Sequence, residues 1–412
     1  MGLENCRVCR AKQSVIPWID FGMVGLANSL HSVGSNSSVV ERLEVGFCRI
    51  CFLAQSINQV DPKRVFGPSY PYFSGTSSTF RKHCEDLAQS VKERVGAFGS
   101  NTALDIAAND GTLLQALSAV GFSTLIGVEP SSSPASKIKE SNSRITLYES
   151  FFTEEIAEKI IQQNGCPDVV TLTNVYAHTP SLDEFNKGLS LLVRGGALVV
   201  IEVQDLLPLT LDAKLDTMYH EHYFCHSLSS IEVAITHFGM KVIDFEEIDI
   251  HGGSIRVFIS DQNSTRFNCE SQSVIQRRNK EAKIFGDCER LLVKSTEIFK
   301  AAKLSFMSYL IASATQGKKV HGFGAAAKSN TFINYCGVTK DLMPIIYDDT
   351  VYKQNRYIPA TTIPIRSSSE ISHLRPDVII VMAWNFFEEI SFVINDEGFE
   401  GTILSLRDFF DL

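Results

Sequence analysis

The sequence predicts an α/β protein in which a small cysteine-rich lobe precedes two Rossmann-like units. Short apolar runs alternate with helix-length segments in two separate parts of the chain, and two Cys-x-x-Cys pairs stand near its start. Such alternation is typical of parallel sheets with crossover helices. At about 100–200 residues per domain, 412 residues allow two to four domains, and a chain of this length buries a core without disulfides.

The composition is that of an ordinary soluble globular protein, with 44% hydrophobic and 21% charged residues. The 38 lysines and arginines against 47 aspartates and glutamates give a net charge of −9, which disfavours sequence-independent binding of nucleic acid. No apolar run reaches the length of a membrane-spanning helix, and the first ten residues show no signal-peptide core. We therefore expect a cytoplasmic protein that binds neither nucleic acid nor membrane, and whose ten cysteines are thiols or metal ligands.

The cysteine-rich lobe is expected to bind zinc. Its two pairs, Cys6 with Cys9 and Cys48 with Cys51, have the spacing of zinc knuckles and together supply four soft ligands. The gap between the pairs is longer than in a minimal zinc ribbon, so it must hold an insertion with paired strands. Because four thiolates leave no open coordination position, we predict a structural rather than a catalytic Zn²⁺.

The alternating segments define the expected secondary structure. In the first region, apolar runs predict a helix at residues 78–98 followed by strands at 103–107, 124–128, 169–173 and 197–202. A long charged helix or helix pair is predicted at 273–316, and a second set of strands at 320–324, 343–347, 378–383 and 402–404. The expected units are a lobe, a central domain, a linking strand with a helical segment, and a C-terminal domain, at residues 1–65, 66–250, 251–316 and 317–412.

The turn after the first central strand is the first candidate ligand site. The second strand ends at Glu129, 19 residues after Asp110, where an acidic residue can hold the ribose hydroxyls of an adenosine. Of the three glycines of a dinucleotide fingerprint only Gly111 is present, and Asp105 and Asp110 would repel a diphosphate but suit a cationic sulfonium. The turn therefore favours S-adenosylmethionine over NAD, with a plain strand-to-helix turn as the alternative.

A dense run of titratable side chains, Tyr219, His220, Glu221 and His222, follows the fourth central strand. The two histidines stand two apart, whereas His-Glu-x-x-His zinc proteases need them four apart on a helix, so that motif is excluded. With His178, these side chains could instead form a proton-transfer cluster, since histidine removes protons near neutral pH. The alternative is a set of structural histidines.

Taken in order, these and further segments resemble one known family. Besides the two cysteine pairs, the segments that carry the likeness are Tyr70-Pro71-Tyr72-Phe73-Ser74, Asn109-Asp110-Gly111-Thr112, Gly127-Val128-Glu129-Pro130, Asn174-Val175-Tyr176-Ala177-His178, Tyr219-His220-Glu221-His222-Tyr223, His251-Gly252-Gly253-Ser254-Ile255-Arg256, Gly322-Phe323-Gly324-Ala325-Ala326-Ala327-Lys328, Ile363-Pro364-Ile365 and Ala383-Trp384-Asn385. They resemble the S-adenosylmethionine-dependent sugar C-methyltransferases that act on dTDP-linked 4-keto-deoxysugars in antibiotic and surface-polysaccharide pathways. Several segments are individually loose, and their shared order over nearly the whole chain makes the likeness specific.

The resemblance implies a fold, a reaction and a set of site residues. The family combines a zinc lobe, a central Rossmann-like methyltransferase domain and a C-terminal Rossmann-like domain, with the sugar nucleotide between the last two. A base, matched here by His222, removes the proton on carbon 3 to give an enolate, which takes the methyl group of S-adenosylmethionine. The supporting polar groups match Glu221, Tyr219, His178 and, of two tyrosines, Tyr72. The residues expected at the cofactor are Asp105, Ala107, Asn109, Asp110, Gly111, Glu129, Pro130 and Asn174.

The turn between Gly322 and Lys328 is expected to receive the diphosphate of the substrate. Its backbone N–H groups open a helix, and Lys328 supplies a counter-charge. The alternative is a Rossmann turn that only packs. Arg256 could line the same cleft or could equally be a strand residue in a surface ion pair. The residues expected to bind substrate are His251, Ser254, Arg256, Gly324, Lys328 and Asn330.

The chain departs from the family pattern in three places. Asp105 stands where the family usually has Glu, Phe224-Cys225-His226 replaces the more frequent Ser-Tyr-Phe, and the loop from Lys353 to Ala360 lacks the glycines before the tyrosine and after the proline. These changes bear on the exact sugar or nucleotide rather than on the reaction class. The expected partner is a dTDP-linked keto-sugar, and we expect the protein to act as a monomer.

Three other functions stay open from the sequence. An O- or N-methyltransferase of another small molecule would share the cofactor turn without needing a cluster that stabilises an enolate. An NAD-dependent oxidoreductase would use the C-terminal turn, with Asp348 or Asp349 about 20 residues further on as the ribose ligand. A zinc-ribbon interaction protein is the non-enzymatic alternative.

Overall fold

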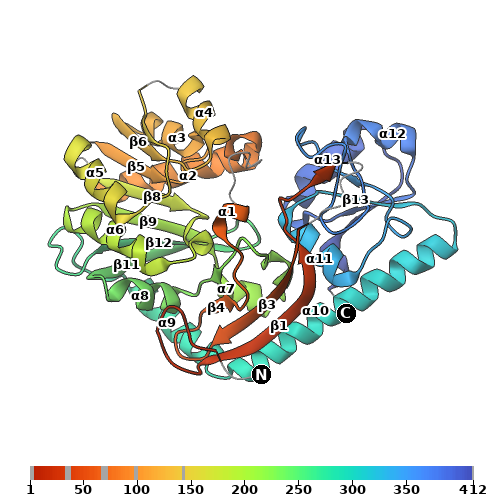
Figure 1. Cartoon of the computed structure of the whole chain (residues 1–412), viewed down its shortest axis with the longest axis horizontal. Coiled ribbons are helices and arrows are strands. Elements are labelled where there is room, and N and C mark those ends of the chain that lie inside the picture. Colours follow the sequence, from red (N-terminus) through yellow and green to blue (C-terminus); the bar gives the residue numbers. More distant parts are fainter. Residues whose placement is uncertain (1–3, 33–38, 66–72, 97–100, 142–143, 411–412) are drawn as a thin grey trace.

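The computed structural model describes residues 4–32, 39–65, 73–96, 101–141 and 144–410. It contains a central seven-stranded α/β domain, a C-terminal five-stranded α/β domain and an N-terminal four-stranded lobe (Figure 1). The α/β fold with two Rossmann-like sheets that the sequence predicts is therefore confirmed. In the part of the chain that is described, no helix combines the length and the apolar character needed to cross a membrane.

The central sheet contains all four strands that the sequence predicts. Its strands are β5 (Thr102–Ile106), β6 (Thr124–Val128), β7 (Thr146–Tyr148), β8 (Val169–Thr173), β9 (Leu198–Gln204), β11 (Met240–Ile248) and β12 (Ser254–Asp261). Their spatial order is β11-β12-β9-β8-β5-β6-β7, with β5 to β9 parallel and β12 antiparallel to both neighbours. The order reverses between β5 and β8, and ligands of such sheets bind outside the carboxyl ends of the strands at that point.

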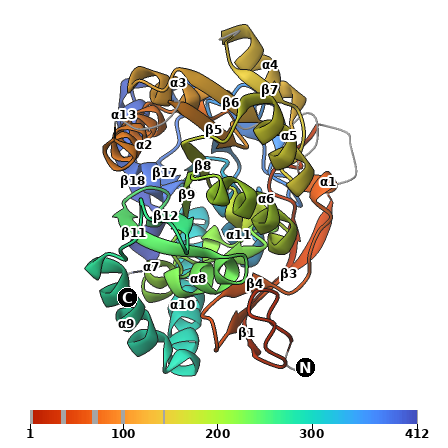
Figure 2. The same cartoon turned by 90° about the vertical axis from the view of Figure 1, so that its left-hand side faces the viewer.

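Helices cover both faces of this sheet (Figure 2). The two groups, one on each face, are α2 (Ser78–Val95), α3 (Thr112–Ala119) and α4 (Ser132–Ser141), and α5 (Glu154–Asn164), α6 (Leu182–Arg194) and α8 (Leu228–Thr236). Because both faces are buried, the strands have continuous apolar sequences rather than alternating ones. The helix predicted at 78–98 ends earlier, at Val95, because Gly96 has a φ of 69° and leaves the helical conformation.

The C-terminal domain is a second parallel sheet with the strand order β16-β14-β13-β17-β18. Its elements are β13 (Val320–Phe323), α11 (Ala327–Cys336), β14 (Ile346–Tyr347), β16 (Ile365–Arg366), α12 (Ile371–Leu374), β17 (Val378–Val381), α13 (Phe387–Asp396) and β18 (Thr402–Ser405). The strand predicted at 343–347 is too long, because it contains Pro344, which has no N–H to donate to a ladder. The sequence did not predict the two-residue strand β16.

The predicted helical segment is a helix pair, α9 (Gln272–Phe285) and α10 (Cys288–Thr315). The long helix α10 lies along the C-terminal domain (Figure 1) and buries Phe299 and Phe306 in a core shared with Trp18 of the lobe. The indole N–H of Trp18 donates to the Ser295 hydroxyl at 3.1 Å. The helix therefore joins the lobe to the C-terminal domain.

The N-terminal lobe is built partly from the central domain. Its sheet has the order β1-β3-β4-β10, and the strands are β1 (Val15–Gly25), β3 (Val40–Cys48), β4 (Ala54–Ser56) and β10 (Phe224–Cys225). The curved pair β1 and β3 extends to α11 (Figure 1). A small second sheet pairs β2 (His31–Ser32) with β15 (Arg356–Tyr357). The lobe thus contacts both larger domains.

Short helical turns connect these elements and carry several candidate residues. His178 lies on one of these turns, and another immediately precedes the Tyr219 segment. The short helical turns are α1 (Pro62–Val65), η1 (Ser74–Thr76), η2 (Tyr176–His178), α7 (Leu206–Leu211), η3 (Leu215–Thr217), η4 (Ser368–Glu370), η5 (Trp384–Phe386) and η6 (Leu406–Phe409).

Candidate functional site

The carboxyl ends of β5 and β8 carry backbone conformations that are unusual for residues with side chains. Ala107, Asn109 and Asn174 have φ angles of 56°, 50° and 55°, and Gly111 has a φ of 81°. Left-handed non-glycine residues cost about 1–3 kcal/mol each and gather at ligand sites. All four residues lie at the topological switch point, so the backbone marks this edge of the sheet as the candidate cofactor site.

Two buried carboxylates lie at neighbouring strand ends, Asp105 near the end of β5 and Glu129 directly after β6. Glu129 accepts the N–H groups of Asn109 at 2.9 Å and Ser131 at 2.7 Å, and Asp105 accepts the Thr171 hydroxyl at 2.7 Å. Burial raises the pKa of both carboxyls, that of Asp105 to about 7. Adjacent acidic groups disfavour a further anion and favour a cation, so they suit a sulfonium better than a diphosphate. Pro130 follows Glu129 directly and is half-buried.

The side chains of Asn109 and Asp110 hold a neighbouring segment in place. The N–H of Ser74 donates to Asn109 Oδ1 at 2.9 Å, and the N–H of Gly75 donates to Asp110 Oδ2 at 2.8 Å. Sequence reasoning missed this docking, because the partners stand 35 residues apart and no local pattern links them. Tyr72, the tyrosine expected in the active site, lies outside the described residues.

The raised pKa of Asp105 predicts a pH-dependent contribution to stability. A carboxyl with a folded-state pKa of about 7 favours the fold below its ordinary pKa of 3.8, and this contribution is lost as the pH rises through 7. Because the loss is spread between pH 3.8 and 7, Asp105→Asn should gain about 2 kcal/mol of stability relative to the wild type between pH 5.5 and 7, and little more between pH 7 and 8.5. Denaturant titrations at several pH values measure the difference. A difference that does not change with pH would contradict the prediction.

His222 lies buried at the centre of the predicted catalytic cluster. Its Nδ1 donates to the Thr217 carbonyl at 2.8 Å, which leaves Nε2 as the nitrogen that can take a proton. The centre of its ring lies 4.7 Å from that of His178 and 4.0 Å from that of Tyr219. Burial lowers the pKa of His222 well below its ordinary value, and the neighbouring His178 lowers it further. His222 is therefore neutral at physiological pH and can accept a proton.

The other polar residues of this segment are fixed by protein partners. His178 Nδ1 donates to the Glu221 carbonyl at 2.7 Å, and burial lowers the pKa of His178 to about 4. The buried Glu221 carboxylate accepts the Asn28 side-chain amide at 2.5 Å. His220 Nε2 donates instead to the carbonyl of Glu41 in the lobe at 3.2 Å. The structure thus brings His222, His178 and Tyr219 together, and His220 bonds to the lobe.

Lys328 of the C-terminal domain is close enough to His222 to influence its pKa. Its positive charge contributes to the low pKa of His222. Its Nζ donates to Asn385 Oδ1 at 2.7 Å and lies 4.4 Å from the centre of the Trp384 ring. The indole N–H of Trp384 in turn donates at 2.7 Å to the fully buried Asp216 on η3. Sequence reasoning missed Asp216, because nothing local shows that a tryptophan 168 residues away covers it.

Three further residues expected at the substrate are Gly324, His251 and Asn330, and each has a different environment. Gly324 has a φ of 97°, and a Cβ atom there would lie 2.6 Å from the Cβ of Ala383, so the turn accepts only glycine. Burial lowers the pKa of His251 to about 4, and a proton on His251 would lower the pKa of His222 further. Asn330 Nδ2 donates to the Gly25 carbonyl of β1 at 2.7 Å.

Arg256 and Ser254 lie on β12. Arg256 is 3% exposed and bonds to Glu202 at 3.1 Å and to Glu246 at 2.7 Å. Glu202 also contacts His83 Nε2 at 2.5 Å. The Ser254 hydroxyl donates to the Ile250 carbonyl at 3.1 Å. Arg256 is therefore a strand residue in an ion pair, as the sequence allowed, but the pair is buried rather than at the surface.

Asp348, the acidic residue that an NAD site would use, closes the C-terminal turn instead. It accepts the Ala325 N–H and the Lys353 ammonium, each at 2.9 Å. Burial alone would raise the pKa of Asp348, but the pairing with Lys353 outweighs burial and lowers it. Its position after the strand thus has a structural explanation, which weakens the oxidoreductase alternative.

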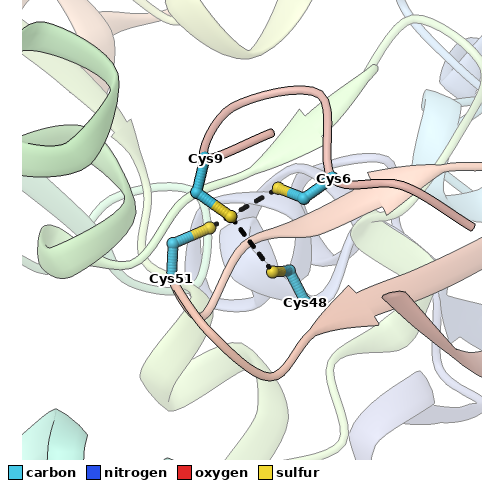
Figure 3. Close-up of side chains that lie close together, drawn as sticks. All are labelled: Cys6, Cys9, Cys48 and Cys51. Carbon is cyan, nitrogen blue, oxygen red and sulfur yellow. Dashed lines mark hydrogen bonds between the residues drawn. The ribbon is translucent and has the colours of Figure 1, made fainter. Parts of the chain in front are cut away.

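The cysteines of the two pairs form a candidate metal centre (Figure 3). The four sulfur atoms of Cys6, Cys9, Cys48 and Cys51 all lie within 4.8 Å of one another. The Cys6–Cys51 and Cys9–Cys48 sulfur distances are 3.6 and 3.7 Å, close to the edge of about 3.8 Å of a tetrahedron with ~2.3 Å zinc–sulfur bonds. The donors and their spacing fit one tetrahedral metal ion.

Comparisons with known proteins match nearly the whole chain. A family described as "Methyltransferase domain" matches residues 80–244, and one described as "C-methyltransferase C-terminal domain" matches residues 249–397. The C-methyltransferase NovU of Streptomyces niveus is 27% identical over 394 residues, which cover 94% of this chain and 91% of that protein.

Solved structures also resemble part of the chain. A methyltransferase from Clostridium acetobutylicum that depends on S-adenosylmethionine is 12% identical with a TM-score of 0.34, covering 44% of this chain and 91% of its own. Magnesium protoporphyrin IX methyltransferase from Synechocystis, solved with bound SAH, is 16% identical with a TM-score of 0.33, covering 48% of this chain and 92% of its own. With scores this low, neither likeness bears on the chemistry of this chain.

Proposed function

We propose that this chain, an S-adenosylmethionine-dependent C-methyltransferase, methylates carbon 3 of a dTDP-linked 4-keto-deoxysugar. The premise is its match to the methyltransferase domain and to the C-methyltransferase C-terminal domain. The observation that carries this proposal is the buried, neutral His222, whose Nδ1 is committed to the Thr217 carbonyl. An O- or N-methyltransferase can also use a base, but it would not need hydrogen-bond donors that stabilise an enolate, whereas forming a carbon nucleophile next to a ketone does.

The first step is proton removal by His222. A ketone at carbon 4 acidifies the C-3–H bond, because its electron pair passes into an enolate. His222 Nε2 takes the proton, directly or through one water, while the Thr217 carbonyl keeps Nδ1 protonated and stabilises the imidazolium. Tyr219, whose ring lies against His222, is proposed to donate to the enolate oxygen, and we assign Tyr72 to the same role from the resemblance. The single N–H of neutral His178 is committed to the Glu221 carbonyl, so we assign His178 a supporting role beside the His222 ring rather than a donor role. Losing one such donor costs about 10²–10³-fold in rate.

The carboxyl ends of β5 and β8 are the proposed site of the methyl donor. S-adenosylmethionine, when bound there, supplies an electrophilic methyl group. The acidic pair Asp105 and Glu129 and the left-handed turns at Ala107, Asn109 and Asn174 would hold it. Gly111, Asp110 and Pro130 complete the expected set. The four cysteines would hold a structural Zn²⁺, which takes no part in the reaction because a Cys₄ site has no open position.

Lys328 is proposed to bind the diphosphate of the substrate. It stands in the first turn of α11, where backbone N–H groups also favour an anion, and burial lowers its pKa to about 8. His251, Ser254, Gly324 and Asn330 stay proposed contacts of the substrate, whereas Arg256, held by Glu202 and Glu246, is left out of this set. The ordinary pKa of 10.5 would keep Lys328 charged throughout the working range, whereas a pKa of about 8 makes binding depend on pH.

The Michaelis constant for the nucleotide sugar should therefore rise above pH 8, by about tenfold per pH unit, as Lys328 loses its proton. Lys328→Arg, which stays charged, should have a higher KM at pH 7 but no rise up to pH 9.5. The matched control is Lys340→Arg at an exposed lysine of the same domain, which should show the wild-type profile. Steady-state kinetics across this range measure all three. A flat wild-type profile, or the same rise in Lys328→Arg, would remove Lys328 from this role.

The experiment that tests the proposed function is a reaction with S-adenosylmethionine and a dTDP-4-keto-6-deoxyhexose, with the UDP-linked sugar alongside. Mass spectrometry should find one added methyl group, and NMR should place it on carbon 3 of the dTDP-linked sugar. A methyl group on oxygen or nitrogen would support the alternative methyltransferase function. No methylation of either sugar would overturn the keto-sugar proposal.

A further inference from the structure

Arg7, between the first two cysteines, links the metal centre to the segment that contains His222. Its Nη2 donates to the carbonyls of Ser56 at 2.6 Å and Tyr223 at 3.1 Å. Its guanidinium lies 4.8 Å from the centre of the Phe224 ring, and its backbone N–H donates to Gln55 Oε1 at 3.0 Å. One side chain of the Cys6–Cys9 turn therefore holds β4 and the two residues that follow His222.

The equivalent position in the second cysteine pair shows that these contacts are specific to Arg7. Arg49 follows Cys48 as Arg7 follows Cys6, yet Arg49 is exposed, whereas Arg7 is partly buried. The two arginines thus occupy the same place in the motif, and only Arg7 faces the central domain with a set of backbone partners.

The lobe holds the His222 segment at other points as well. The Ser56 N–H donates to the Tyr223 carbonyl at 3.0 Å, and β10 pairs with β4. The Tyr223 hydroxyl donates to the Val60 carbonyl at 2.7 Å. Asn28 of the lobe donates to Glu221, and His220 donates to the carbonyl of Glu41 in the lobe. The residues on both sides of His222 are therefore bonded to the lobe.

The side chain of His222 donates within its own segment, to the Thr217 carbonyl. The lobe can thus act on the base only by fixing the backbone that carries it. A displacement of about 1 Å in a catalytic group costs on the order of 10²-fold in rate, so a firm backbone at this point has a kinetic effect. A metal ion bound by Cys6 and Cys9 would in turn fix the turn from which Arg7 projects.

We propose that Arg7 is a positioning residue for His222, and that the metal centre supports catalysis through it rather than only folding the lobe. The proposal rests on the proposed role of His222 as the base. The positioning role also explains why the last strand of the lobe sheet, β10, comes from the chain directly after the catalytic segment.

The test compares Arg7→Ala, Arg7→Lys and the matched control Arg49→Ala, each checked for bound zinc by elemental analysis and for fold by circular dichroism. Arg7→Ala should retain one zinc per chain and lower kcat by about tenfold to a hundredfold, with KM for S-adenosylmethionine within about twofold of the wild type. Arg7→Lys should recover part of kcat, because an ammonium can still donate to these carbonyls but lacks the planar guanidinium that lies against the Phe224 ring. Arg49→Ala should match the wild type.

Hydrogen exchange supplies a readout that needs no substrate. In Arg7→Ala with zinc retained, peptides covering residues 219–226 should exchange about tenfold faster, while peptides from β5 and β6 should not change. Wild-type kcat together with unchanged exchange in Arg7→Ala would overturn the positioning role. If the wild type fails to methylate any keto-sugar, the proposed function fails, and faster exchange in Arg7→Ala would still show that Arg7 holds this segment.

Discussion

Replacing His222 by asparagine is expected to lower kcat for methyl transfer by about 10²–10⁴-fold, the usual contribution of a general base. The asparagine amide can still donate to the Thr217 carbonyl, so the segment should keep its conformation, but it has no nitrogen that takes a proton. Binding of S-adenosylmethionine at β5 and β8 should be unchanged, because His222 belongs to a different segment.

Isothermal titration with S-adenosylhomocysteine and turnover measurements separate these two effects. His237→Asn, at an exposed histidine that follows α8, is the matched control and should keep wild-type turnover. Turnover of His222→Asn within about threefold of the wild type would remove His222 from the role of base.

Replacing Cys51 by serine is expected to have the largest effect on stability. Cys51 is 2% exposed and its sulfur lies 3.6 Å from that of Cys6, so a serine there leaves a metal ion with three thiolates in a site built for four. Structural zinc contributes several kcal/mol to folding, up to about 10–16 kcal/mol in small zinc domains. The variant should lose stoichiometric zinc and unfold at a lower temperature, with the lobe strands exchanging first.

Elemental analysis and thermal unfolding measure this result. The exposed Cys269 offers the matched control, since Cys269→Ser removes a thiol far from the metal motif in sequence and should change neither zinc content nor unfolding temperature. A folded wild type that holds no zinc, or a Cys51→Ser variant that still holds one ion per chain, would contradict the structural zinc site.

The sequence predicts β5, β6, β8 and β9 of the central sheet because these strands are continuous apolar runs, but it did not predict β7 or β11. The runs at 124–128 and 169–173 coincide with β6 and β8, since strands buried on both faces need apolar residues throughout. The two-residue strands β10 and β16 carry no such signal. Each forms by pairing with a strand from another part of the sequence: β10 pairs with β4, and β16 pairs with β14.

The candidate site likewise has a part that the sequence predicts and a part that it does not. The cysteine pairs and the Tyr219–His222 run are local in sequence, and the structure brings the four sulfurs together and the rings of His222, His178 and Tyr219 into contact. Long-range partners decide the rest. The contacts of Arg7 with Tyr223 and of Asp216 with Trp384 join residues 216 and 168 positions apart, so no local pattern could have shown them. The cofactor and substrate residues stay predictions until a ligand is bound.

The most direct test of the central claim is exchange of the carbon 3 hydrogen of a dTDP-4-keto-6-deoxyhexose in deuterated buffer, followed by NMR with S-adenosylhomocysteine in place of the methyl donor. The wild type should incorporate deuterium at carbon 3 well above the rate without enzyme, and His222→Asn should not. Equal exchange in the two proteins, or methylation of carbon 3 by His222→Asn at the wild-type rate, would contradict an enolate formed by His222.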